Sequence, residues 1–427
     1  EEYPGVASYQ ASFAVSLLNS AQLSLVRDKN LAQARKLLER AVGTYRPLVR
    51  AYPENQHYVH HLINSCLLLS GALAALGDAQ GAAKWLREAE DVFCDSIVAL
   101  QRLPRGSFRV ASLCLDVAEE LEFSFGLWSR AGRPREAAAI HQQITQLYGR
   151  TLARTPGNAG VLLGRGDAYR RLRRMDEALA DYQQAAGLLE KEAMSHATAE
   201  HQKQLATSLN NLADLLKVKG RFGEAEEAAR KALAWWRRLA ADSPEEPTCR
   251  FGVGDGLFRL GKVLAAAQRH QEAEQLFRQA AAIFQPLAAE FPDEPGFLLM
   301  EADTFRLHLG PLLAGQPARL RDAEEAYRHG IAAGERLAAR FPELDREYHR
   351  RLGNAYHALM NLLRSDGRRD AAMQVGRQAR DFYKRLAVNH PKETSIHAEL
   401  ARFNKEMSRL LQAVGQPGPA KPTQKPD

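Results

Sequence analysis

An alanine recurs about every 48 residues along almost the whole chain, and this repeat limits the folds that the chain can adopt. The eight alanines are Ala34, Ala82, Ala137, Ala178, Ala225, Ala273, Ala323 and Ala372, at intervals of 48, 55, 41, 47, 48, 50 and 49 residues. Prolines follow the same period, at Pro53, Pro104, Pro156, Pro244, Pro292, Pro342 and Pro391. The period predicts stacked units, each of which buries its apolar face only against its neighbours.

The stretch Leu209–Pro244 shows what one unit contains. Its first half carries leucines at i, i+3 and i+7, which form one apolar helical stripe. Gly220 then supplies the left-handed backbone conformation that ends many helices. The second half carries a stripe of small residues at Ala225, Ala229 and Ala232. Large residues on one helix and small residues on the next predict a tight antiparallel helical hairpin.

This pattern resembles the tetratricopeptide repeat family. In that family large residues occupy repeat positions 4, 7 and 11, small residues occupy 8, 20 and 27, and a glycine lies near 15. Those positions here hold Leu209, Leu212, Leu216, Ala213, Ala225, Ala232 and Gly220. The proline that the family places near position 32 arrives seven residues late, at Pro244, so a longer second helix is expected. The resemblance implies an all-α, right-handed α-solenoid of about eight antiparallel helical hairpins.

The repeat pattern also predicts the domain organisation. Residues 1–391 are expected to form the solenoid, residues 392–415 a C-terminal capping helix near Glu393–Val414, and residues 416–427 a disordered tail. The fourth unit is the shortest, and the seventh carries an insertion at Gly315–Arg319. A break or bend in the solenoid is most plausible at these two units.

Composition and charge restrict the functional classes. A hydrophobic content of 45% and a charged content of 26% are those of a folded water-soluble protein. The net charge is +7, but the arginine doublets are spread over many units, so nucleic-acid binding is disfavoured and an RNA-binding solenoid is kept as an alternative. The sequence contains no run of 18 apolar residues, so no membrane-spanning helix is predicted. Four scattered cysteines indicate buried thiols in a reducing compartment, so the chain is expected to be cytoplasmic. Because the sequence begins at Glu1, it is expected to be part of a longer protein.

The sequence contains no arrangement that predicts catalysis, a cofactor or a metal. The run Gly252–Gly256 lacks the glycine spacing of a dinucleotide loop and predicts close helix packing. His57, His60 and His61 form the one histidine cluster, but Glu54 is the only acid near them in sequence, so no metal is expected. Of the pair Trp235–Trp236, one side chain is expected in the core and the other partly exposed. The chain is therefore not expected to be an enzyme.

A second resemblance concerns context. The phrase Leu337–Ala372 resembles the long repeats that follow the catalytic domain in many planctomycete-type bacterial serine/threonine protein kinases, and the phrase starting at Leu209 resembles the kinesin-light-chain type of repeat. The chain has no kinase Gly-rich loop, His-Arg-Asp loop or Asp-Phe-Gly motif. One alternative function is thus the regulatory or substrate-docking region of such a kinase, with the catalytic domain elsewhere.

The leading hypothesis is a protein-interaction scaffold. In the family, positions 2, 5, 6, 9, 12 and 13 of each first helix face the concave groove. From the fourth to the eighth unit this set supplies Asp167, Arg170, Arg171, Asn210, Asn211, Asp214, Lys217, Asp255, Arg259, Lys262, Asn354, His357, Asn361 and Arg364. Asparagine amides pair with a peptide backbone and arginines with carboxylates, so a peptide or protein segment with some acidic character is expected. Position 6 is Gly164 or Ala358 in two units, so the carboxylate clamp of chaperone-binding repeats is not reproduced.

Overall fold

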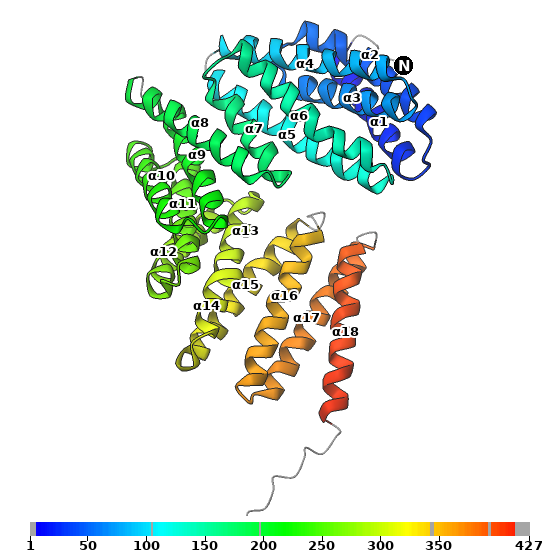
Figure 1. Cartoon of the computed structure of the whole chain (residues 1–427). Helices are drawn as coiled ribbons and strands as arrows, with labels where there is room; N and C mark the ends of the chain where they lie inside the picture. The colour runs from blue at the N-terminus through cyan, green and yellow to red at the C-terminus, as the bar shows by residue number, and fades with distance from the viewer. Residues whose placement is uncertain (1–5, 104–105, 196–197, 342–345, 392–393, 415–427) are drawn as a thin grey trace, which may run out of the picture. The chain divides into compact units, whose positions relative to one another are not determined.

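The computed structural model describes residues 6–103, 106–195, 198–341, 346–391 and 394–414 (Figure 1). These residues form two compact bodies, one up to Trp235 and one from Trp236 onward. The first body contains α1 (Ala7–Val26), α2 (Leu31–Ala51), α3 (Gln56–Ala75), α4 (Ala79–Gln101), α5 (Gly106–Arg130), α6 (Pro134–Arg154), α7 (Ala159–Arg171), α8 (Met175–Ser195) and α9 (Ala199–Val218). α10 (Phe222–Asp242) spans the residue at which the two bodies are divided.

The second body continues the series of helices. It contains α11 (Pro247–Ala266), α12 (His270–Glu290), α13 (Pro295–Asp303), a π-helix η1 (Thr304–Leu309), α14 (Gly310–Ala314), a 3-10 helix η2 (Pro317–Arg319), α15 (Leu320–Arg340), α16 (Arg346–Ser365), α17 (Arg369–Asn389) and α18 (Thr394–Val414). No strand occurs among the described residues. The all-α repeat solenoid is thereby confirmed, and α18 packs on α16 and α17 where a capping helix was expected. The predicted tail, residues 416–427, lies outside the described residues.

The turns of the hairpins follow from local backbone chemistry. Gly220 takes a φ of +74°, and the N–H of Arg221 donates to the carbonyl oxygen of Leu216 at 2.9 Å. This six-to-one bond closes the helix end as a glycine C-cap does. In the sixth hairpin the same left-handed position is occupied by Gln268, at φ +63°. A glycine is therefore favoured at this turn but is not required.

One contact recurs inside the hairpins and explains the small residues of the first helices. A Cβ built on Gly166 would lie 2.8 Å from the ring of Tyr182, and one on Gly261 would lie 2.8 Å from the ring of Phe277. In each case an aromatic ring of the second helix packs flat against the first helix where the side chain is missing. The glycine and the ring lie sixteen residues apart in both hairpins, so the same packing contact recurs at the same positions of the repeat.

Three smaller expectations are confirmed. The glycines of α11 are buried, and a Cβ on Gly252 would lie 2.1 Å from the ring of Trp236. Trp236 is buried while Trp235 is half-buried. The four cysteines are all buried, and no disulfide joins them. These residues serve packing.

One helix, α3, is long and apolar enough by length and composition to cross a membrane. In this structure 67% of its most apolar stretch is buried among neighbouring helices, as in the core helix of a helical bundle. A single helix of this kind is weak evidence of a span.

Candidate functional site

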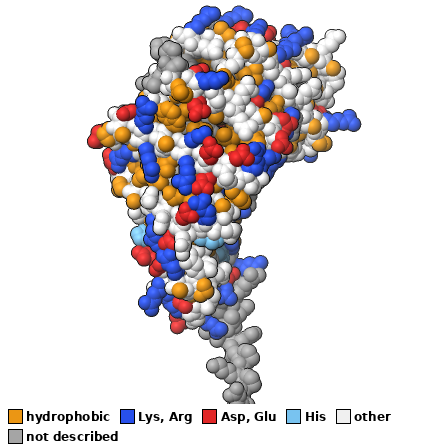
Figure 2. All heavy atoms as spheres, turned by 60° about the vertical axis from the view of Figure 1, so that its left-hand side comes forward, with side chains coloured by type: hydrophobic (Ala, Val, Ile, Leu, Met, Phe, Trp, Pro, Cys, Tyr) orange, Lys and Arg blue, Asp and Glu red, His pale blue; other side chains and the backbone are white. Residues whose placement is uncertain are grey.

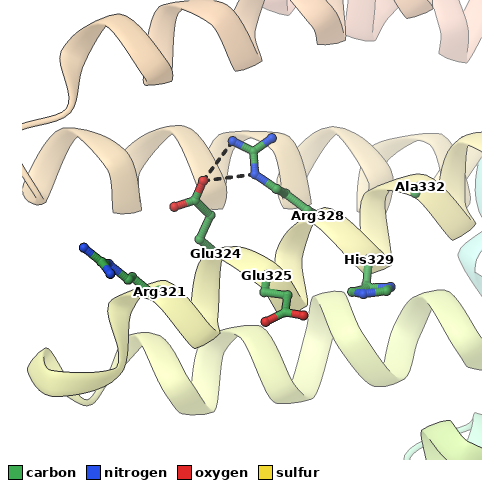
Figure 3. Close-up of a pocket in the computed structure, with 6 residues that line it drawn as sticks. All are labelled: Arg321, Glu324, Glu325, Arg328, His329 and Ala332. Atoms are coloured by element: carbon green, nitrogen blue, oxygen red, sulfur yellow. Dashed lines mark hydrogen bonds and ion pairs between the residues drawn. The ribbon is translucent and has the colours of Figure 1, made fainter.

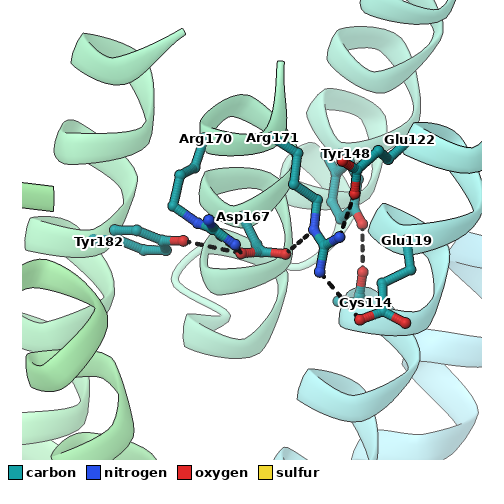
Figure 4. Close-up of polar contacts among 8 residues, drawn as sticks. All are labelled: Cys114, Glu119, Glu122, Tyr148, Asp167, Arg170, Arg171 and Tyr182. Atoms are coloured by element: carbon teal, nitrogen blue, oxygen red, sulfur yellow. Dashed lines mark hydrogen bonds and ion pairs between the residues drawn. The ribbon is translucent and has the colours of Figure 1, made fainter. Parts of the chain in front are cut away.

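Three of the residues predicted to line the groove form one ion network in the fourth hairpin (Figure 4). Asp167 accepts hydrogen bonds from Arg170 at 2.5 Å and from Arg171 at 2.6 Å. The hydroxyl of Tyr182, on the second helix of the hairpin, donates to the same carboxylate at 3.3 Å. Arg171 also reaches across to α5, where it binds Glu119 at 3.1 Å and Glu122.

The network holds Asp167 in its ionised form. Burial alone would raise the pKa of this carboxyl, but hydrogen bonds and charge from Arg171 and Arg170 hold it below its usual value. Asp167 is only 5% exposed, so it faces its own chain and not an open groove. These contacts join α7 to α5 and α8, so the main role of Asp167 is structural.

The predicted residues of the fifth and sixth hairpins are also engaged within the chain. Asn210 is buried, Asn211 is half-buried, and Lys217 lies 3.0 Å from Asp214. In the second body Arg259 donates to Asp255 at 2.8 Å, and the ammonium of Lys262 lies 5.5 Å from the ring centre of Phe258. A ligand of the charged groups among them would therefore have to compete with contacts inside the chain.

The predicted residues of the eighth hairpin meet the capping helix. Asn354 accepts a hydrogen bond from Arg402 at 2.8 Å, and Arg364 lies 3.8 Å from Glu406. The ring of His357 stacks on Phe403, with centroids 4.5 Å apart and planes at 6°. Asn361 is exposed. The predicted set is thus divided between two bodies, and the structure does not gather it into one site.

The stacked ring of His357 leads to a pH prediction. Burial, with a smaller contribution from Arg402, lowers the pKa of His357 to about 4, and Glu406 opposes the shift. Between pH 6.5 and 4 the unfolded chain therefore binds a proton that the folded chain does not, so stability falls as pH falls through this range. After allowance for solvent screening of a partly exposed ring, we expect a loss of about 1–2 kcal/mol.

The variant His357→Phe keeps the stacking on Phe403 and removes the titrating group. Hydrogen exchange of the α18 amides at pH 7 and pH 4.5 measures the effect, with the exposed His397→Phe as the matched control. We expect wild type and the control to lose protection at low pH, and His357→Phe to lose about 1–2 kcal/mol less. An equal loss in all three would contradict the assignment.

The structure reveals a further site that the sequence did not predict. A hollow of about 440 Å³ opens between three successive first helices, α1, α3 and α5, and we call it the α1/α3/α5 hollow. Its lining residues are Leu18, Asn19, Gln22, His60, His61, Asn64, Asp116, Glu119, Glu120 and Phe123. The spacing was visible in the sequence, since 57, 60, 61, 64 on α3 and 116, 119, 120, 123 on α5 each follow one helical face.

The chemistry of this hollow is acidic. Three carboxylates line it, and none of its lining residues is lysine or arginine. Glu120 accepts a hydrogen bond from the amide of Asn64 at 2.5 Å, and burial raises the pKa of Glu120 to about 7. Burial and the neighbouring imidazoles lower the pKa of His60 to about 4 and that of His61 to about 3. Both histidines are therefore neutral at pH 7, so any charge in the lining comes from its carboxylates, of which Glu120 is close to half protonated at that pH and Glu119 is paired with Arg171 at 3.1 Å.

Two other hollows carry both signs of charge. One lies along α15 and is lined by Arg321, Glu324, Glu325, Arg328, His329 and Ala332 (Figure 3). There Glu324 is bound by Arg328 at 2.8 Å and by Arg368 at 2.5 Å. The second, of about 680 Å³, includes Arg46 and Glu88 among its lining residues, and these two are ion-paired at 2.5 Å. Because both linings mix the two signs of charge, these hollows select a charged ligand less clearly than the α1/α3/α5 hollow, in which Glu119 is the acid paired with Arg171, at 3.1 Å.

The charges on the molecular surface are mixed. On the face drawn in Figure 2, lysine and arginine side chains lie interspersed with aspartate and glutamate over the described residues. Many of the arginines are bound to acids on the same or the next helix, as Arg221 is to Glu224 at 2.6 Å and Arg250 is to Glu290 at 2.8 Å. The net positive charge is thus distributed and not collected on this face.

Comparison with known proteins identifies the repeats. Family models for the tetratricopeptide repeat match residues 204–285 and residues 159–188. Repeats of this family are therefore present in the fourth hairpin and from α9 to α12, as the sequence pattern predicted. Among proteins with curated descriptions, none matches the chain.

Several solved structures resemble the chain. A Rap protein complexed with competence and sporulation factor shares 15% identity over 94% of this chain and 98% of that chain, at a TM-score of 0.35. The pilF protein of Pseudomonas aeruginosa shares 15% identity over 69% and 99%, at a TM-score of 0.33. A putative kinesin light chain of Podosopora anserina with nearly identical TPR-like repeats shares 18% identity over 51% and 93%, at a TM-score of 0.29.

Proposed function

We propose that the chain is a protein-interaction scaffold, and that the α1/α3/α5 hollow binds a segment of a partner protein that carries a lysine or arginine side chain. The observation that carries the proposal is the lining of the hollow, which has three carboxylates and no lysine or arginine. The presence of tetratricopeptide repeats supports the general role, because stacked helical repeats build extended binding surfaces.

The residues of the hollow can contribute three kinds of contact to such a segment: a charged contact, hydrogen bonds to the backbone, and an apolar contact. Asp116 on α5 offers a carboxylate to the hollow, and a guanidinium can bind a carboxylate through two parallel hydrogen bonds. The amides of Asn19 and Gln22 on α1 can pair with a peptide backbone. Phe123, which is 42% exposed at the edge of the hollow, offers an apolar surface for the stem of a long side chain. This preference is opposite to the acidic peptide that the sequence suggested.

The acidic lining argues against an RNA ligand in this hollow. A phosphate backbone is attracted by lysine and arginine, and its affinity comes largely from the counterions that these contacts release. Carboxylates at the same place would repel it. The RNA-binding alternative is therefore not favoured at the α1/α3/α5 hollow.

Selection from a phage-displayed library of random peptides on the intact chain tests the proposal. We expect the enriched peptides to contain lysine or arginine, and Asp116→Asn to weaken the best peptide by about tenfold or more, as loss of one charge-assisted contact predicts. The exposed Asn361→Ala, at a position that the sequence placed in the groove, is the matched control and should leave the affinity unchanged. If Asn361→Ala weakens binding and Asp116→Asn does not, the site lies in the sequence-predicted groove instead.

A kinase-associated role is a second hypothesis, and it rests on the phrase Leu337–Ala372 alone. In that case the scaffold would bind a substrate or regulator for a catalytic domain encoded in the same gene. The coding sequence before Glu1 tests this directly, because a kinase domain there would support the hypothesis and its absence would remove it.

A further inference from the structure

Three histidines converge at the start of α3. His57, His60 and His61 each offer a ring nitrogen, and these nitrogens all lie within 4.8 Å of one another. The ring centroids are 5.2 Å apart for His57 and His60, 4.4 Å for His57 and His61, and 4.0 Å for His60 and His61. Among the residues that the structure describes, this is the one group of three metal-ligating side chains brought so close together.

Two of the three rings carry an unsatisfied buried atom. The Nδ1 atoms of His60 and His61 are buried and have no hydrogen-bond partner in the protein. A buried polar atom without a partner costs about 1–3 kcal/mol, so these two nitrogens are expected to be completed by water, a ligand or an ion.

A carboxylate stands behind the cluster. Glu120, which α5 supplies about sixty residues further along the chain, lies with its Oε1 3.7 Å from Nε2 of His60. Its other oxygen is fixed by the amide of Asn64. A metal-bound imidazole usually donates its second N–H to a carboxylate, which fixes the orientation of the ring, and Glu120 would have to move closer to accept from His60 in this way. The sequence could not show that Glu120 lies close to His60, because this proximity depends on the packing of α5 on α3.

We propose that His57, His60 and His61 bind a divalent transition-metal ion of the zinc class, with Glu120 as a positioning residue behind His60. Imidazole nitrogens favour zinc, copper and nickel, whereas magnesium and calcium take oxygen ligands. Zinc–nitrogen bonds of about 2.0–2.1 Å place two tetrahedral ligand atoms about 3.4 Å apart. Ring nitrogens within 4.8 Å reach that spacing by small side-chain rotations.

The electrostatic surroundings permit a cation here. The N-terminal end of α3 carries a partial positive charge that opposes a cation by about 0.3–1 kcal/mol at an exposed site. Asp116, Glu119 and Glu120 on α5 act in the opposite direction, and none of the residues lining the adjoining hollow is lysine or arginine. Three imidazoles leave a fourth zinc position for water or a carboxylate.

Calorimetric titration of ZnCl2 into the full chain tests the site. The protein must carry no histidine tag and must be treated with a chelator beforehand. We expect one zinc per chain, no comparable binding of Mg²⁺ or Ca²⁺, and a loss of affinity of at least tenfold in His57→Ala. His57 is exposed, so this substitution leaves the packing of α3 intact.

Two further variants complete the test. Glu120→Gln should weaken zinc binding by about 10- to 100-fold, the usual effect of removing the carboxylate behind a ligand histidine. His270→Ala removes an exposed histidine at the start of α12 and should change nothing. Wild type that binds no zinc, or that binds it no better than His57→Ala, overturns the site; equal affinity in Glu120→Gln overturns the role of Glu120.

The inference is independent of the proposed partner segment, although His60, His61 and Glu120 also line the α1/α3/α5 hollow. The zinc titration contains no peptide, and the peptide selection is carried out with a chelator present. Failure of one experiment therefore leaves the other unaffected.

Discussion

Asp303→Ala is expected to lower the free energy of unfolding of the second body by about 3–5 kcal/mol, the usual effect of removing one partner of a buried ion pair. Arg306 has a fully buried side chain, and its guanidinium binds Asp303 through Nε at 2.8 Å and Nη2 at 2.7 Å. Without the carboxylate, a positive charge would remain in the core with neither water nor a counter-ion. A loss of this size is a large part of the stability of an ordinary domain.

The surroundings of Arg306 leave it no alternative position. Its guanidinium carbon lies 4.8 Å from the ring centre of Tyr348. On the opposite helix Gly330 is so close that a Cβ there would lie 2.7 Å from the backbone nitrogen of Arg306. The side chain is therefore enclosed between η1, α15 and α16, and it cannot turn to water when its partner is removed.

Two comparisons make the test specific. Asp293→Ala removes the same residue type from an ion pair with Arg340 in which Asp293 is 83% exposed, and exposed pairs contribute only about 0–1 kcal/mol in general. The double variant Asp303→Leu/Arg306→Met removes both charges together, and we expect it to recover most of the loss. Hydrogen exchange of the amides from α13 to α16 measures each variant. Equal protection in Asp303→Ala and Asp293→Ala would contradict the prediction.

The helices also show which structural features can be predicted from the sequence and which cannot. Helix boundaries governed by local signals were predictable, such as α2 at Leu31–Ala51 and the Thr198 cap whose side chain accepts from the N–H of His201. The π-helix η1 could not be predicted, because Thr304–Leu309 contains no proline or glycine that would signal an irregular helix. A neighbouring helix comes close to it, since a Cβ on Gly330 of α15 would lie 2.7 Å from the backbone nitrogen of Arg306, and a contact between residues so far apart in sequence is not visible before the helices are packed.

The candidate binding residues could be predicted only in part, because their contacts also depend on how the helices pack. Repeat positions indicate which face of a first helix a residue occupies, but not which neighbour reaches it. The bond of Arg171 to Glu119 joins residues 52 apart, and that of Arg402 to Asn354 joins residues 48 apart. Such pairs exist only once adjacent repeats are stacked. The α1/α3/α5 hollow depends on the same stacking, because its lining comes from three successive hairpins.

Asp167→Ala is expected to cause the second large loss, about 2–3 kcal/mol from the first body. The variant removes the acceptor of Arg170, Arg171 and the buried hydroxyl of Tyr182. The loss should be smaller than for Asp303→Ala because the arginines have alternatives. The side chain of Arg170 is 43% exposed, and Arg171 keeps Glu119 and Glu122 on α5.

A matched pair of variants separates the contributions within this network. Asp176→Ala removes an exposed acid that is paired with Lys219 in the same body, and it should change the free energy of unfolding little. Asp167→Asn keeps an oxygen that can accept from Tyr182 while removing the charge, so it should fall between wild type and Asp167→Ala. Hydrogen exchange of the α5 and α7 amides provides the measurement, and an effect of Asp167→Ala no larger than that of Asp176→Ala would refute the structural role.

The Asp167 prediction also decides how binding data on this chain must be interpreted. Asp167 was selected from the sequence as a groove residue, yet its carboxylate holds α7 against α5, the helix that supplies Asp116, Glu119 and Glu120 to the α1/α3/α5 hollow. A weaker peptide affinity in Asp167→Ala would therefore follow from a loosened α5, and it should be accompanied by lower protection of the α5 and α7 amides in the absence of peptide. Asp116→Asn removes a charge that lines the hollow itself, so it should weaken the peptide affinity with no change in the protection of α7.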